Sequence, residues 1–135
     1  MRGLQFITKQ TYNGIRTGRY MFDTRLSDLS LATCSANISR DTALINSLCV
    51  KPTFRNRRIG SALLKYTEDF LWNKGVSFIN INLLINQNIY RDEFYAKNGY
   101  NTVNIIDNIH DDGEYIYDMV HMNKIINMDN DVINL

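Results

Sequence analysis

The sequence lacks any long apolar run and contains a single proline and only two cysteines among its 135 residues. A membrane-spanning helix needs about 20 consecutive apolar residues, and the N-terminus shows no apolar core of a secretory signal. We therefore expect a soluble, cytoplasmic protein. The low proline content and the 44% share of hydrophobic residues exclude collagen-like and disordered classes. The length predicts one domain, since domains most often have roughly 100 to 150 residues.

The two cysteines, Cys34 and Cys49, lie in apolar stretches rich in β-branched residues. Neither has the spacing of a metal ligand to His110 or His121. We expect both to be buried free thiols in a reducing compartment, and we expect no metal site.

Charge is distributed unevenly, although the net charge is only +1. Residues 1–67 contain 11 Lys and Arg against 3 acids, whereas residues 68–135 contain 4 against 11. One run, residues 51–58, is basic without any acid, and another, residues 107–118, is acidic without Lys or Arg. An enzyme that joins an anionic cosubstrate to a cationic acceptor would use such a separation.

Hydrophobic periodicity predicts an α/β fold. Apolar residues at helical spacing predict a helix over residues 59–73, with Gly75 just beyond its end. Stretches rich in β-branched and aromatic residues, bounded by turn residues, predict the strands. The remaining predicted elements are strands at 4–9, 19–23, 29–38, 43–50, 76–85, 100–106 and 114–122, and a helix at 89–97.

These elements predict a mixed, mostly antiparallel sheet flanked by helices, with one parallel pair of strands around the helix that starts at Ile59. Residues 1–125 are expected to form the domain, and residues 126–135 a loosely packed tail. The acidic residues 107–113 are predicted to form a loop between the last two strands.

Residues 48–64 (LCVKPTFRNRRIGSALL) join a strand end, a basic turn and a helix start. The first amides of a helix have no intrahelical acceptor, and the helix dipole favours anions there. Arg55, Arg57 and Arg58 would add charge-assisted hydrogen bonds. The segment therefore predicts a pyrophosphate site, and the alternative is a solvated basic turn.

This run resembles the cofactor motif of the GNAT family of N-acetyltransferases. In that motif, Arg or Gln, two residues, Gly, one residue, and Gly or Ala lead into the helix that holds the pyrophosphate of acetyl-CoA. Arg55 and Gly60 take the first and last positions, and Arg58 stands where the family has its middle glycine. The resemblance implies acetyl-CoA as cosubstrate. It implies that the residues binding it include Leu48, Cys49, Val50, Arg55, Asn56, Arg57, Arg58, Ile59, Gly60 and Ser61.

Residues 88–100 (NIYRDEFYAKNGY) match a second signature of the same family. The resemblance implies that Asn88 binds the pantetheine arm and that Tyr95 protonates the departing thiolate. A phenol with a pKa of about 10 is well matched to a thiol as a proton donor. The alternative for Tyr95 is a core aromatic that packs the helix together with Phe94.

The implied function is acetyl transfer to a primary amine. The acidic residues 107–114 would attract a cationic acceptor, such as a polyamine, an aminoglycoside, or a protein lysine or N-terminus. Many family members carry a Glu as general base on the fourth strand, whereas this sequence has Asn46. His110 and His121 could replace that base, or they could be ordinary surface residues.

The interval between the first two strands, residues 10–19, is too short for the two helices that the family usually has there. The acceptor side is therefore expected to be open, or completed by a second subunit in a homodimer. One rival hypothesis is a GNAT-fold binding protein without catalysis that holds CoA or a protein partner. Nucleic-acid binding through residues 51–58 is the weaker rival, because the other half of the chain is acidic.

Overall fold

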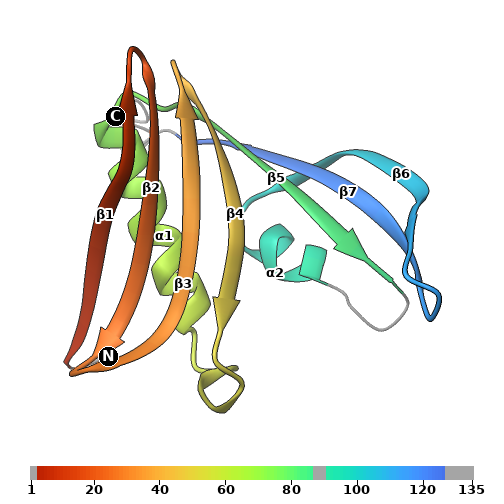
Figure 1. Cartoon of the computed structure of the whole chain (residues 1–135), viewed down its shortest axis with the longest axis horizontal. Coiled ribbons are helices and arrows are strands. Elements are labelled where there is room, and N and C mark those ends of the chain that lie inside the picture. Colours follow the sequence, from red (N-terminus) through yellow and green to blue (C-terminus); the bar gives the residue numbers. More distant parts are fainter. Residues whose placement is uncertain (1–2, 87–90, 127–135) are drawn as a thin grey trace, which may run out of the picture.

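A computed structural model of the protein describes residues 3–86 and 91–126. These residues form a seven-stranded sheet in the order β1-β2-β3-β4-β5-β7-β6 (Figure 1). The elements are β1 (Leu4–Gly14), β2 (Thr17–Leu26), β3 (Leu29–Ser39), β4 (Thr42–Val50), the 3-10 turn η1 (Pro52–Phe54), α1 (Ile59–Asn73), β5 (Phe78–Ile85), α2 (Arg91–Lys97), β6 (Asn101–Asp111) and β7 (Ile116–Ile125). Among the described strands, β4 and β5 alone are parallel neighbours, which confirms the predicted fold class.

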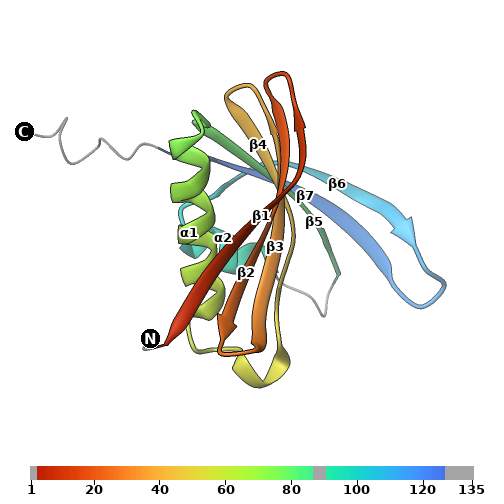
Figure 2. The same ribbon diagram turned by 60° about the vertical axis from the view of Figure 1, so that its left-hand side comes forward.

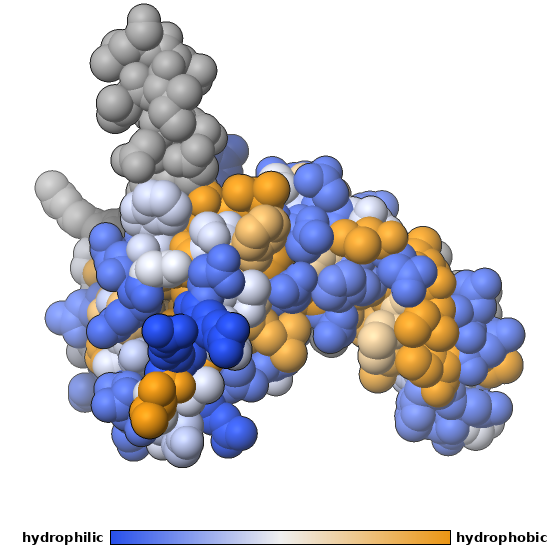
Figure 3. All heavy atoms as spheres, turned by 90° about the horizontal axis from the view of Figure 1, so that it is seen from above, coloured by the Kyte–Doolittle hydropathy of each residue, from blue (hydrophilic) through white to orange (hydrophobic). Residues whose placement is uncertain are grey.

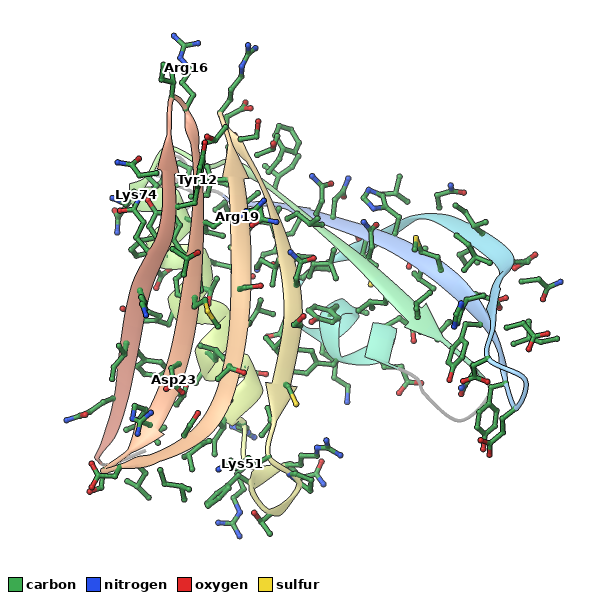
Figure 4. All side chains as sticks on the ribbon, viewed as in Figure 1. Tyr12, Arg16, Arg19, Asp23, Lys51 and Lys74 are labelled. Atoms are coloured by element: carbon green, nitrogen blue, oxygen red, sulfur yellow. The ribbon has the colours of Figure 1, made fainter. Side chains whose placement is uncertain are left out.

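Both helices cover the same face of the sheet (Figure 2). Helix α1 packs on β2, β3 and β4, and α2 packs on β5 and β6. Tyr66 and Phe70 of α1 form ring contacts with aromatic residues of the first two strands, namely Phe6, Tyr20 and Phe22. The opposite face, which we call the bare face, has no helix over it in the described part of the chain; it carries Tyr12, Arg19 and Asp23 and faces the viewer in Figure 4.

The first hairpin is longer than the sequence predicts. Ile15 and Arg16 form the whole connection between β1 and β2, and Arg16 has a left-handed backbone with φ of 55°. Gly14, just before this turn, leaves room for two side chains, because a Cβ there would meet Thr17 Oγ1 and lie 2.8 Å from the Tyr12 ring. The polar residues 10–14 gave no strand pattern because they form an exposed edge of the sheet. No helix lies between these two strands.

The predicted acidic loop over residues 107–113 is wrong. Strand β6 continues to Asp111 and pairs with β7 through two register shifts, which hide the alternation expected of a strand. The hairpin of β6 and β7, which we call the arm, extends away from the body of the molecule (Figure 3). Its exposed apolar residues include Val103, Ile105, Ile106 and Ile109.

Strand β5 begins at Phe78 rather than at residue 76, since the amides of Ser77 and Phe78 bond the carbonyl of Asp41. Ile126, the first residue of the predicted tail, is buried and its amide bonds the carbonyl of Ser77. The rest of that tail lies outside the described residues.

Both cysteines are free thiols, but only Cys34 is buried. Burial raises the pKa of the Cys34 thiol to about 11. The expectation that Cys49 is buried is wrong. Cys49 pairs with Thr33 on β3, and both side chains point to the bare face. Among residues 3–86 and 91–126, no helix is long and apolar enough to span a membrane.

Candidate active site

Strands β4 and β5 lie together only at their beginnings. Residues 42–45 of β4 pair with residues 78–81 of β5, and the strands then diverge (Figure 1). The remaining residues, 46–50 of β4 and 82–85 of β5, form what we call the splay. Their facing backbone edges do not bond each other, so amide and carbonyl groups there can bond an extended ligand.

A β-bulge in β4 accompanies this divergence. Asn46 pairs with Ser35 and Cys49 pairs with Thr33, so that Ser47 and Leu48 together oppose Cys34. Ser47 has a left-handed backbone with φ of 58°. Because a bulge bends its strand and increases the local twist, it turns the end of β4 away from β5. Ser47 was not predicted as a site residue, since serine gives no signal for a left-handed position.

The basic turn before α1 combines left-handed backbone with the uncapped start of a helix. Asn56 and Arg58 both have left-handed backbones, with φ of 62° and 63°. When successive residues alternate between right-handed and left-handed backbone, their amides can point toward one position. No side chain caps α1 and no acid lies in its first turn, so the amides of Ile59, Gly60 and Ser61 keep no intrahelical acceptor.

The start of α1 lies directly against the splay. Gly60 is buried, and a Cβ there would lie 3.2 Å from Val50 Cγ2 and 3.4 Å from the Phe94 ring. The Arg55 guanidinium donates from Nε to the Val50 carbonyl at 3.1 Å. The Arg57 guanidinium lies over the Phe54 ring, 5.6 Å from its centroid. The structure therefore brings the residues predicted to bind the pyrophosphate next to residues 48–50, predicted to bind pantetheine.

Replacing Arg58 with glycine is expected to stabilise the protein and to weaken CoA binding. A non-glycine residue in the left-handed region costs about 1 kcal/mol, which glycine avoids. The lost guanidinium would otherwise bond a phosphate, so we expect the dissociation constant for CoA to rise roughly tenfold. Thermal unfolding and calorimetry measure the two effects. Tighter CoA binding in Arg58→Gly would show instead that the side chain obstructs the phosphates.

Helix α2 carries Tyr95 and docks on the start of α1. The Asn98 amide donates from Nδ2 to Ser61 Oγ at 3.4 Å and to the Phe94 carbonyl at 2.8 Å. Tyr95 is 5% exposed, and its ring meets those of Phe94 and Tyr100 edge-on. Tyr95 is thus a core aromatic packed beside the start of α1. The predicted site residue Asn88 lies outside the described residues.

A buried ionic network holds these elements in place. The Tyr100 hydroxyl donates to Glu68 Oε2 at 2.9 Å, and Lys124 Nζ contacts Glu68 Oε1 at 2.9 Å and the Asn98 carbonyl at 2.8 Å. Burial, together with the Glu68 carboxylate, raises the pKa of Tyr100. The sequence pattern did not indicate a role for Glu68, although this residue lies between Leu64 and Leu71 on the buried stripe of α1.

A cavity of about 590 Å³ lies between the end of β5 and the arm. It is lined by Ile85, Asn86, Asn108, Glu114, Tyr115, Ile116 and Asp118. Only part of the predicted acidic cluster therefore faces a cavity. Asp112 instead accepts the amides of Tyr115 and Glu114 and the Tyr117 hydroxyl, which lower the pKa of its carboxyl. Asp111 accepts the amide of Gly113, so both aspartates hold the turn.

Several solved structures resemble this chain, although no curated protein sequence matches it. Among solved structures, ribosomal-protein-S18-alanine N-acetyltransferase from Escherichia coli has a TM-score of 0.72 at 22% identity, covering 86% of this chain and 73% of that one. A GNAT family acetyltransferase from Elizabethkingia anophelis with acetyl-CoA bound has a TM-score of 0.72 at 14% identity, covering 93% and 100%. An aminoglycoside 6'-N-acetyltransferase complexed with coenzyme A has a TM-score of 0.69 at 19% identity, covering 79% and 72%.

At these identities the structural likeness shows the fold. The family described as the acetyltransferase (GNAT) domain matches residues 20–102, more than half of the chain. This match spans the bulged strand, the basic turn, α1 and α2. The resemblance seen in the sequence is thereby confirmed, and the chain belongs to the GNAT family of acetyltransferases.

Proposed function

We propose that the protein transfers an acetyl group from acetyl-CoA to a cationic primary amine. The observation that carries this proposal is the uncapped start of α1, with two left-handed residues before it, placed directly against the splay. One feature suits a pyrophosphate and the other suits an extended arm, and acetyl-CoA has both.

The pyrophosphate would bind the amides of residues 56–61 and the guanidinium groups of Arg55, Arg57 and Arg58. All three arginines are exposed, which leaves their charge free to attract an anionic ligand. The pantetheine arm would bond the backbone of residues 48–50 along the edge where β4 has no described strand beside it, as an added strand does; the Val50 carbonyl itself is held by Arg55. Asn88, which the family resemblance implies as a pantetheine ligand, is proposed to bond the same arm.

The chemistry needs a polarised thioester carbonyl and an acid for the leaving group. Backbone amides at the bulged end of β4 would polarise the carbonyl. The Tyr95 phenol would supply the proton to the thiolate, and its burial beside Phe94 and Tyr100 keeps water from competing for that proton.

A cationic acceptor is supported by the cavity at the base of the arm. Glu114 and Asp118 line it, and the second half of the chain is strongly acidic. Two of the similar structures are enzymes named for an alanine of a ribosomal protein and for aminoglycosides, acceptors that carry a cationic amine at neutral pH. A cytoplasmic location is part of the proposal and is supported by the two free thiols.

The variant Glu114→Gln is expected to raise the Michaelis constant for a polycationic acceptor about two- to fivefold at low salt. Its carboxylate makes no hydrogen bond in the described residues, so the change removes a charge and leaves the turn intact. The exposed Asp41→Asn, beyond the opposite end of β5, is the matched control. Equal Michaelis constants for the two variants would remove the cavity from the acceptor site.

Thiol release from acetyl-CoA tests the function. The acceptors are spermidine, kanamycin, a peptide with an N-terminal alanine and a lysine-rich peptide. The proposal expects release that depends on at least one of them. CoA binding without release would favour the second candidate, a binding protein, which the absence of a carboxylate at Asn46 supports.

A homodimer that covers the bare face is also expected if a second subunit completes the acceptor site. Sedimentation velocity measures this oligomeric state.

A further inference from the structure

The imidazole of His121 lies beside the splay. His121 on β7 pairs with Asn82 on β5, and its Nδ1 lies 2.6 Å from Asn82 Oδ1. Asn82 is the first residue of β5 beyond the segment that pairs with β4. The histidine is therefore one strand away from the point at which β4 and β5 separate.

The imidazole points to the bare face. Side chains alternate between the two faces of a strand, and directly paired residues share a face. The neighbours of Asn82 and His121 along their strands are buried under the helices: Ile81, Leu83, Val120 and Met122. Asn82 and His121 therefore face the opposite way, and His121 is half-buried there.

The acceptor amine of the proposed reaction should reach the thioester from this bare face. The pyrophosphate site at the start of α1 and the packed contact of Gly60 with Val50 and Phe94 lie on the helix side of the splay. A base must therefore lie on the bare face, close to the splay. On β4 the residue in that place is Asn46, whose amide cannot accept a proton at neutral pH.

We propose that His121 is the general base of the acetyl transfer and that Asn82 orients it, an inference that rests on the proposed function. Asn82 Oδ1 can only accept a hydrogen bond, so Nδ1 carries the hydrogen and Nε2 keeps its lone pair. A base held by a third group in this way is the arrangement that activates nucleophiles in many enzymes. Adjacent strands lie about 4.8 Å apart, a distance that one bridging water spans.

Each proton in the reaction has a place. The ammonium group of the acceptor gives one proton, directly or through a water, to Nε2 of His121, which later releases it to solvent. The amine lone pair forms the C–N bond at the thioester carbonyl carbon, and the C–S bond breaks. Tyr95 protonates the thiolate and regains a proton from the acetylated nitrogen. The products are an amide, free CoA and one proton in solution.

Two other titratable groups lie on the bare face at the described, paired positions of β6 and β7: Tyr117 on β7 and His110, its partner on β6. Tyr117 is four residues along β7 from His121, roughly 13 Å at the usual rise of a strand. Its neighbours on the bare face of β5 and β6 are Asn80, Asn82, Leu84, Asn101, Asn104 and Ile106. The charged residues of its own strand, Asp118 and Lys124, pair with Ile85 and Ile79 and point to the helix side. His121 is therefore the titratable group of β5, β6 and β7 nearest the splay on this face, and the His110→Gln variant separates its contribution from that of the other imidazole.

The test is the pH profile of kcat/KM for His121→Gln, measured with whichever of the four amines turns over fastest. We expect a fall of about 100-fold at pH 7 and loss of the acidic limb of the profile, because an imidazole changes charge between about pH 5 and 8. The dissociation constant for acetyl-CoA should stay unchanged. His110→Gln is the matched control, since His110 lies on β6 with its ring tilted against Tyr117. It should behave as the wild type.

Asn82→Asp is a second test, and its expected result would not follow if Asn82 had a purely structural role. A carboxylate beside Nδ1 favours the imidazolium, so the acidic limb should move to higher pH. An unmoved limb, or an His121→Gln variant with wild-type rate and profile, would overturn the inference while acetyl transfer itself stands. Absence of thiol release from the wild type would instead refute the proposed function.

Nitrogen NMR reports on His121 independently of turnover. The tautomer with hydrogen on Nδ1 is expected, and the tautomer with hydrogen on Nε2 would contradict the arrangement.

Discussion

The double variant Arg57→Glu and Arg58→Glu is expected to lose affinity for CoA by about 100-fold or more while remaining folded. Both side chains are exposed at the start of α1. The change removes two charge-assisted hydrogen bonds and places two carboxylates beside a pyrophosphate. Each lost bond costs about 1.5 to 3 kcal/mol, and 1.4 kcal/mol is a tenfold change in affinity. Isothermal titration with CoA measures the effect.

The matched control is Arg16→Glu together with Arg40→Glu. These arginines are also exposed and also have left-handed backbones, with φ of 55° and 58°. They line a basic cavity of about 480 Å³ at the end of the sheet away from Lys51 (Figure 4). The control should bind CoA nearly as the wild type does. An equal loss in both double variants would mean that overall charge, rather than the start of α1, governs binding.

Tyr95→Phe is expected to lower kcat by roughly 100-fold or more, with little change in the dissociation constant for acetyl-CoA. The substitution removes one hydroxyl and keeps the ring that packs against Phe94 and Tyr100. A group that acts only as the thiolate departs stabilises the transition state and not the bound substrate. Steady-state thiol release, with calorimetry for binding, separates the two quantities.

Tyr100→Phe is the control for Tyr95, because it removes a neighbouring hydroxyl from the same stack of rings. That hydroxyl bonds Glu68, so its loss should cost about 1 to 2 kcal/mol of stability. Glu68 keeps its contact with Lys124, and kcat should change little. If both variants lost turnover equally, Tyr95 would be a packing residue and the proton would come from elsewhere.

Much of the fold was predictable because its signals are local. The helix over residues 59–73 was predicted with the bounds that α1 has, since its apolar positions repeat along a single segment. The strands of the first hairpin and of the arm were predicted with the wrong bounds. Both β1 and β6 are exposed edge strands, so their residues bury little surface and alternate poorly between apolar and polar. Their bounds are set by pairing with β2 and β7, which no short window of sequence contains.

The candidate site divides in the same way. The basic turn and the residues through Ser61 are consecutive in the chain, so a motif could indicate them. The bulge at Ser47 depends on the register between β3 and β4. The pair of Asn82 and His121 joins strands 39 positions apart, and Glu68 meets Lys124 at 56 positions. Such contacts follow from sheet order rather than from spacing.

An amide NMR titration with acetyl-CoA tests the central claim most directly, because it locates the ligand whether or not the protein turns over. The largest shifts are expected at the amides of residues 56–61 and of residues 47–50, which form the start of α1 and the bulged end of β4. The amides around Arg16 and Arg40, in the other basic cavity, should stay in place. Shifts confined to that second cavity, or no shifts at millimolar acetyl-CoA, would contradict the account.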